Sequence, residues 1–323
     1  MGVQVSADRF ALNTLQWVTA ARGTATAQRP DGSDTFADPA FLGVYDSILA
    51  RVAEAGFPAV MLKVPPTQTI PSYRRMVADH GLGLAPGYVQ VALPEDRGES
   101  IRAGSARWFR WFDPVRRRAE ESLGCGLTRV FLASDIQLSG RPRVDEAAAI
   151  GFAFDSGRLQ RVIELLGEAV DVLAAEGVQA GLHNHVGTWV ETEDEITAVL
   201  DALPALCCGF DLGHLAWAGI DPVAMVGRYA DRVIDLHIKD IDLEVAAACR
   251  ASHTSYQAAS ASRLFLELGL GGIDLAGALA QLPAGFDGTV IVEVDRPSMD
   301  PDVSARTSWE WVHTHAAMAV AHA

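Results

Sequence analysis

Two neighbouring segments of the chain end in side chains that bind metals or move protons. The apolar run that starts at Cys207 ends at Asp211, with His214 just beyond it. The next apolar run ends at His237, and Lys239 follows. A buried parallel strand is normally a plain apolar run, so a carboxylate and an imidazole at successive strand ends indicate an active-site rim. The structural alternatives are a helix cap for Asp211 and a core histidine for His237.

Similar groups end two further apolar segments. His183 and His185 close the run 178–185, and Glu293 lies near the end of the run 289–294. Residues two apart on a strand share a face, so the two histidines can point the same way, as can His237 and Lys239. Carboxylates together with imidazoles form the mixed donor set that suits Mn, Co, Fe or Zn. These strand ends therefore predict a divalent metal site.

The elements that must position these groups alternate along the chain. Strand-like runs separated by helical patterns are predicted at 11–17, 59–64, 84–91, 129–134, 178–185 and 289–294, with two more that hold Asp211 and His237. Eight strand–helix units without a linker predict a closed parallel (β/α)8 TIM barrel, α/β in class, as one domain over 1–323. The first strand is followed by no Gly-x-Gly-x-x-Gly turn, which argues against a dinucleotide fold.

One connection is much longer than the others. Residues 241–272 separate the seventh strand from its helix, and a segment of this length is usually functional. We expect a lid-like insertion over the barrel mouth. Arg263 and Glu267 within it are candidate substrate-binding residues, together with His214 and with Lys63 at the end of the second strand.

The composition limits the partners. The chain has 323 residues, of which 49% are hydrophobic, so it can build a large core. Its net charge of −15 repels phosphate backbones, so nucleic acid is not an expected partner. No apolar run is long enough to span a membrane, and the first residues do not resemble a signal peptide. The four cysteines fit neither a zinc site nor a CxxC motif. We expect a cytoplasmic protein with reduced cysteines.

Three stretches of the second half resemble a known superfamily. They read GLHNHVGTWVETEDEI, GFDLGHLAWAGIDPVAMVGRYADRVIDLHIKDID and GFDGTVIVEVDRP. They are similar to the xylose isomerase-like TIM barrels, which include sugar phosphate isomerases and epimerases, and within that superfamily most similar to the inosose dehydratases. The resemblance covers the fifth strand to the C-terminus, whereas the first half matches in layout only.

The resemblance implies a ligand set. In the superfamily a divalent metal is held by Glu, Asp, His and Glu on strands five to eight. These positions fall here on His183, Asp211, His237 and Glu293, with His183 in place of the first Glu and His185 as the fallback.

Two further departures concern the substrate. Met61 stands where such families commonly carry a Glu on strand two, and Leu270 stands where the dehydratases have an acidic residue. Both are compatible with retained metal chemistry and a different substrate.

The implied activity is a metal-dependent lyase acting on a polyhydroxylated ketone such as an inosose or keto-sugar. A divalent ion, with Mn expected first and Co, Mg, Fe or Zn as alternatives, would polarise the carbonyl and stabilise an enediolate. His185 is the expected base, with Lys239 and then Glu293 as further catalytic candidates.

Several alternatives stay open. A keto-sugar isomerase or epimerase would use two opposed carboxylates, of which only Glu293 is present, so elimination is favoured. A C-glycoside-cleaving lyase with a small second subunit is a close variant, and a non-enzymatic binding barrel is the third hypothesis. The partner expected in each enzymatic case is a small polyhydroxylated molecule, and the chain could form a homo-oligomer.

Overall fold

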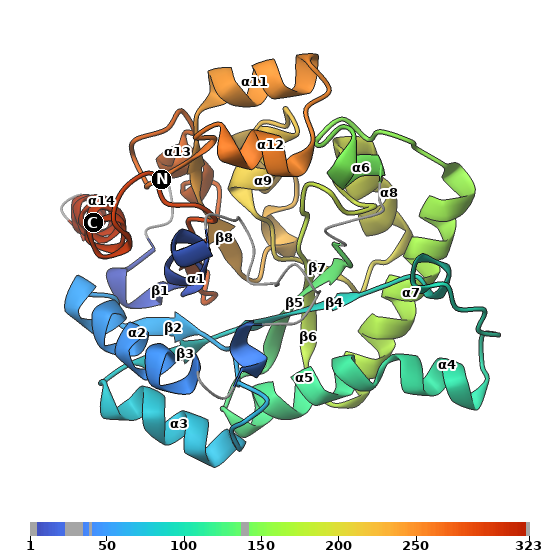
Figure 1. Ribbon diagram of the computed structural model, residues 1–323, viewed down its shortest axis with the longest axis horizontal. Helices are drawn as coiled ribbons and strands as arrows, with labels where there is room; N and C mark the ends of the chain where they lie inside the picture. The colour runs from blue at the N-terminus through green and yellow to red at the C-terminus, as the bar shows by residue number, and fades with distance from the viewer. Residues whose placement is uncertain (1–4, 23–34, 39–40, 137–141, 321–323) are drawn as a thin grey trace.

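The computed structural model describes residues 5–22, 35–38, 41–136 and 142–320. Nine strand segments within them line the centre, and helices surround them (Figure 1). The segments are β1 Phe10–Leu12, β2 Ala59–Met61, β3 Gly83–Ala85, β4 Gly87–Val91, β5 Arg129–Ser134, β6 Gln179–Leu182, β7 Cys207–Cys208, β8 Leu236–Ile238 and β11 Val290–Val292.

These segments form one closed parallel barrel. One sheet has the order β3-β2-β1-β11-β8 and the other β4-β5-β6-β7. Parallel bridges from Cys208 to Val233 and from Asp211 to His237 connect the β7 side to the β8 side. Only Pro86 separates β3 from β4, so these two segments act as a single strand that pairs first with β2 and then with β5. The predicted TIM barrel is confirmed.

The break in the third strand follows from two residues, Pro86 and Gly87. Proline has no N–H to donate to a strand ladder, so pairing stops at Pro86. A Cβ on Gly87 would lie 2.9 Å from the backbone oxygen of Leu62, so only glycine allows the two backbones to approach this closely.

The helices that cover the barrel follow the predicted alternation. They include α2 Phe41–Ala55, α3 Ile70–Asp79, α5 Asp113–Gly124, α7 Ser156–Ala175, α8 Glu193–Ala202, α10 Pro222–Arg228, α13 Leu275–Leu279 and α14 Pro301–Val320. Helix α7 buries Val162, Leu165, Leu166, Ala169, Val170 and Leu173 at three- and four-residue spacing. Each large side chain buried in this way contributes about 1.5–3 kcal/mol.

The first strand is shorter than predicted. It ends at Leu12, and the helix α1, Leu15–Arg22, begins three residues later. The Asn13 side chain accepts a hydrogen bond from the Leu15 backbone N–H at 3.1 Å, which closes a turn. Trp17, which we assigned to the strand, is therefore helical.

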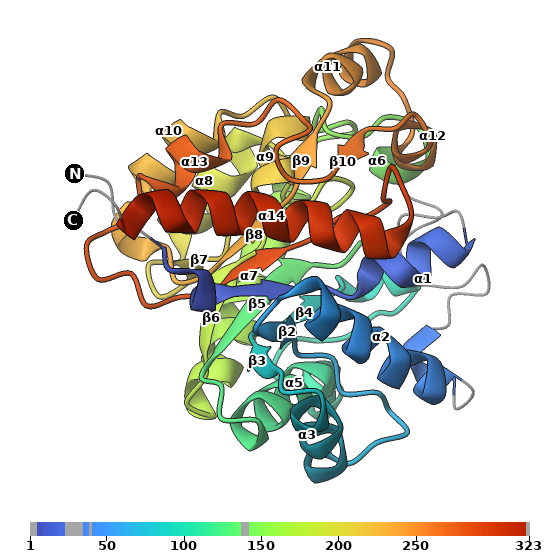
Figure 2. The same ribbon diagram turned by 90° about the vertical axis from the view of Figure 1, so that its left-hand side faces the viewer.

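The segment 241–272 is a compact insertion. Strands β9 (Asp240–Ile241) and β10 (Phe265–Leu266) form an antiparallel pair, and helices α11 (Leu243–Ala251) and α12 (Tyr256–Ala261) lie between them. Figure 2 shows α11 and α12 at the same end of the barrel as α6, Pro142–Asp145. Within the described residues, no helix is long and apolar enough to cross a membrane.

Candidate metal centre

Three of the predicted ligands meet at the carboxyl ends of their strands. His183 follows β6, Asp211 follows β7 and His237 lies in β8, and each offers a donor atom within 4.8 Å of the others. The Asp211 Oδ2 atom is 3.8 Å from His183 Nε2 and 3.9 Å from His237 Nδ1. All three residues are buried. The fourth predicted ligand, Glu293, joins the group because its Oε2 lies 3.0 Å from His237 Nδ1.

Asp211 serves the fold and the site at once. Its Oδ1 accepts the backbone N–H of His214 at 3.0 Å and caps helix α9, Leu212–Trp217. Its Oδ2 faces the two histidines and forms an ion pair with Lys239 Nζ at 3.1 Å. The helix-cap alternative and the ligand hypothesis therefore describe different oxygen atoms of one carboxylate.

The donor atoms fit a divalent cation. His183 Nε2 and His237 Nδ1 both face Asp211 Oδ2, at 3.8 and 3.9 Å, so each of the three side chains presents one donor atom to the same space. Two imidazoles and a carboxylate form a set that divalent transition metals accept. Glu293 Oε2 lies 3.0 Å from the same nitrogen, His237 Nδ1, and so brings a second carboxylate oxygen to these donor atoms.

The buried charges also require a cation. Lys239 Nζ lies 3.1 Å from Asp211 Oδ2, 2.9 Å from Glu293 Oε2 and 2.7 Å from Asp295 Oδ2. When all three carboxylates are ionised, they and the one ammonium leave two negative charges in this buried cluster. A divalent ion would neutralise them, which is the condition for burying such a cluster at low cost.

Burial and ion pairing shift the pKa values of this cluster in different directions. Burial alone would lower the pKa of Lys239, but Asp211, Asp295 and Glu293 outweigh it and raise the pKa well above its usual value. Burial raises the pKa of Asp211, and it raises the pKa of Asp295 to about 7. For Glu293, burial is outweighed by Lys239 and His237, which hold its pKa well below the ordinary range.

The rings of His185 and His214 pack against each other beside the donor group, tilted by 39°. Their ring centroids are 3.7 Å apart, and His214 Nε2 lies 3.4 Å from Lys239 Nζ. His185 Nδ1 is 2.7 Å from the backbone oxygen of Val186, which fixes the tautomer with the proton on Nδ1 and leaves Nε2 as an acceptor. Burial, then Lys239, lowers the pKa of His185 to about 4, so the imidazole is neutral.

The structure does not bring the remaining predicted substrate contacts into this cluster. The Lys63 ammonium lies 5.1 Å from the centre of the Phe36 ring. Arg263 is exposed. Glu267 is buried, and its two oxygens accept hydrogen bonds from the Ser298 N–H at 3.0 Å and hydroxyl at 2.5 Å. Their contact with substrate stays a prediction.

Two residues of the site were not predicted from the sequence. Asp295 pairs with Lys239, and the Asn13 amide donates to Glu293 Oε1 at 2.5 Å. The two-residue spacing that we applied to the histidines also relates Glu293 to Asp295, so that signal was available. Asn13 became recognisable as a strand-end residue only once β1 was known to stop at Leu12.

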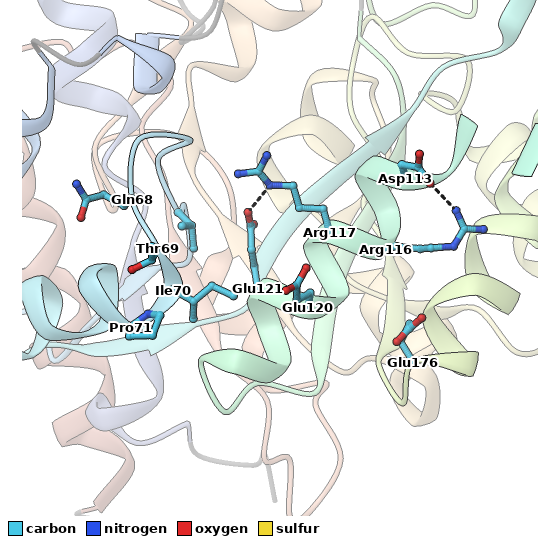
Figure 3. Close-up of a pocket in the computed structure, with 11 residues that line it drawn as sticks. Gln68, Thr69, Ile70, Pro71, Asp113, Arg116, Arg117, Glu120, Glu121 and Glu176 are labelled. Atoms are coloured by element: carbon cyan, nitrogen blue, oxygen red, sulfur yellow. Dashed lines mark hydrogen bonds and ion pairs between the residues drawn. The ribbon is translucent and has the colours of Figure 1, made fainter. Parts of the chain in front are cut away.

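A pocket elsewhere on the surface does not belong to this centre. A cavity of about 800 Å³ lies between the start of α3, helix α5 and the end of α7. Figure 3 shows the side chains that line it. Charged side chains such as Arg116, Arg117 and Glu121 line it, and none of its lining residues is a predicted ligand.

The fold and the donor group define a TIM barrel with a candidate metal centre at the carboxyl ends of its strands. A family model described as xylose isomerase-like TIM barrel matches residues 49–315. The chain belongs to this family.

Similar proteins give further context. The chain is 28% identical over 263 residues to an inosose dehydratase of Geobacillus kaustophilus (strain HTA426), covering 80% of this chain and 82% of that protein. It superposes on a xylose isomerase-like TIM barrel protein from Mycobacterium smegmatis in complex with magnesium, with a TM-score of 0.62, 19% identity, and coverage of 98% and 99%. An L-ribulose 3-epimerase gives a TM-score of 0.63 at 16% identity, with coverage of 97% and 96%.

Proposed function

We propose that this protein is a metal-dependent lyase that eliminates water from a polyhydroxylated ketone such as an inosose or keto-sugar. The broader conclusion, a sugar-processing enzyme, is supported by the inosose dehydratase relative and by the family. His183, Asp211, His237 and Glu293 would hold the divalent ion, for which Mn suits the mixed donors and Mg or Zn are alternatives. When bound, this ion would supply a Lewis acid for the substrate carbonyl.

One observation favours elimination over epimerisation: of the two opposed carboxylates that related epimerases use, this chain has only Glu293, because His183 stands at the strand-five position, and the neutral imidazole of His185 lies beside the donor group. His185 keeps Nε2 available because its Nδ1–H is committed to Val186. Glu293, the other candidate, already receives Asn13 on Oε1 and both His237 and Lys239 on Oε2. An epimerase of this superfamily needs two opposed proton-transfer groups, whereas an elimination can use one.

A single base can carry out both proton transfers of this reaction. His185 Nε2 would remove the proton α to the carbonyl reversibly and leave an enediolate, whose electron pair would then form the carbon–carbon double bond and expel the β-hydroxyl. The protonated imidazole would then return the proton to the departing hydroxide, so water is released and His185 is neutral again. Three carboxylates surround the Lys239 ammonium and already accept its protons. Its catalytic role therefore stays a prediction.

Incubation of the Mn²⁺-loaded protein with an inosose tests this function, with a ketohexose in parallel. We expect a product that has lost one water, identified by mass spectrometry and NMR. A product of unchanged mass that is an epimer or isomer of the substrate would favour the isomerase alternative. The C-glycoside-cleaving variant, the second subunit, the homo-oligomer and the cytoplasmic location stay predictions.

A further inference from the structure

Asp295 is a buried carboxylate that the donor group does not use. It lies two residues beyond Glu293 and is 2% exposed. Its Oδ2 is 2.7 Å from Lys239 Nζ, closer than the oxygen of either other carboxylate. A buried carboxylate requires a partner, and for Asp295 that partner is Lys239.

Lys239 shares its other two carboxylates with the candidate metal site. An ammonium has three protons to donate, and the oxygens of Asp211, Glu293 and Asp295 lie within 3.1 Å of it. Asp211 and Glu293 are also proposed metal ligands. The ammonium and a metal ion would therefore compete for the same two oxygen atoms, Asp211 Oδ2 and Glu293 Oε2.

We propose that Asp295 is a positioning residue that keeps Lys239 paired and thereby frees Asp211 and Glu293 to bind a divalent cation. The inference deepens the proposed function and rests only on its metal site, not on the reaction. With Asp295 present, three carboxylates, one ammonium and a divalent ion sum to zero charge. Without it, the ammonium has only the two ligand carboxylates, and a bound dication leaves a net positive charge in a buried site.

The Asp295→Asn variant tests this inference because it removes the charge and keeps the size. Calorimetric titration of the metal-stripped protein with Mn²⁺, repeated with Zn²⁺, measures the affinity. We expect Asp295→Asn to weaken binding about tenfold or more, as outer partners of metal ligands commonly do. Asp235→Asn is the matched control: Asp235 is also 2% exposed, but it accepts the Thr289 N–H and does not contact Lys239. It should bind Mn²⁺ with wild-type affinity.

The Lys239→Met background shows whether Asp295 acts through Lys239. There the competing ammonium is gone, so adding Asp295→Asn should weaken Mn²⁺ binding several-fold less than it does in the wild type. Asp295→Glu, which retains the charge, should restore most of the affinity. If Asp295→Asn does not fold, the double variant Lys239→Met/Asp295→Asn, which removes both charges of the pair, carries the test: retained tight binding supports the inference.

The outcomes separate the inference from the proposed function. Wild-type affinity in Asp295→Asn, or an equal loss with and without Lys239, would overturn the positioning role alone. A wild-type protein that binds neither ion would overturn the metal site and this inference together. A protein that shows the expected affinities but does not dehydrate inososes would refute the lyase and support the inference.

Discussion

Asn184 and Asp211 hold each other through two hydrogen bonds between consecutive strand ends. The Asn184 amide donates to the Asp211 backbone oxygen at 3.1 Å, and its own oxygen accepts the Asp211 N–H at 3.0 Å. Both residues are buried. The pair fixes the backbone of the central carboxylate next to His183, which precedes Asn184 in the chain. It is therefore a structural support of the donor group.

Replacing Asn184 by Leu should weaken both the fold and metal binding. The variant leaves the buried N–H of Asp211 without a partner, whereas the Asp211 carbonyl keeps the Leu215 N–H at 3.0 Å, so the cost is about 1–3 kcal/mol of unfolding free energy. Urea unfolding in the presence of a chelator measures this loss, and calorimetry measures the affinity for Mn²⁺. Gln160→Leu is the control, because the Gln160 amide pairs with Glu164 on an exposed helix face. Equal stability of the two variants would refute the support role.

Replacing His185 by Gln should stop proton abstraction without releasing the metal. Gln cannot act as a general base at neutral pH, and His185 is not a proposed ligand. The measurement is exchange of the substrate α-proton with solvent deuterium, followed by NMR. His80→Gln is a matched control, since His80 pairs with Asp46 outside the barrel mouth. Unimpaired exchange in His185→Gln would transfer the base role to another residue, with Glu293 examined next.

Shortening the insertion should abolish turnover and leave metal binding intact. A short turn that replaces residues 243–263 would keep the β9–β10 pair and remove α11 and α12. The ring of Tyr256 on α12 stacks with the ring of His185, with 6.0 Å between their centroids, so the deletion also removes a side chain that packs against the proposed base. Steady-state kinetics and metal titration of the shortened protein measure both effects. Unchanged turnover would show that the insertion is not a functional lid.

Glu191 should make stability depend on pH. Burial, opposed by Arg143, raises its pKa from 4.5 to about 6, so the folded protein binds the proton more tightly than the unfolded chain. The contribution of Glu191 to the free energy of unfolding is fully present below pH 4.5. It falls by about 2 kcal/mol as the pH rises through 6. The Glu191→Gln variant does not lose this contribution, because Gln does not titrate. Its unfolding free energy should therefore rise by this amount relative to wild type between pH 4 and 7, and a parallel pH dependence of the two would contradict the shift.

The sequence predicted the barrel because alternating apolar runs and helical patterns are local signals. It also predicted that the groups at four strand ends would meet, since parallel strands place their carboxyl ends at one rim. It could not show which oxygen of Asp211 caps a helix and which faces the histidines, because that depends on side-chain rotation. It also could not show that Glu267 bonds to Ser298, a partner 31 residues away whose position only the folded chain sets.

The central claim is that Asp211 is a ligand of a divalent ion, and elemental analysis of Asp211→Asn tests it most directly. Asn retains the oxygen that caps helix α9 and removes the charge that faces the histidines. Asp221→Asn, at the cap of α10, is the matched control. We predict about one divalent ion per chain in the wild type and the control, and loss of the ion in Asp211→Asn. Stoichiometric metal retained by Asp211→Asn would contradict the assignment.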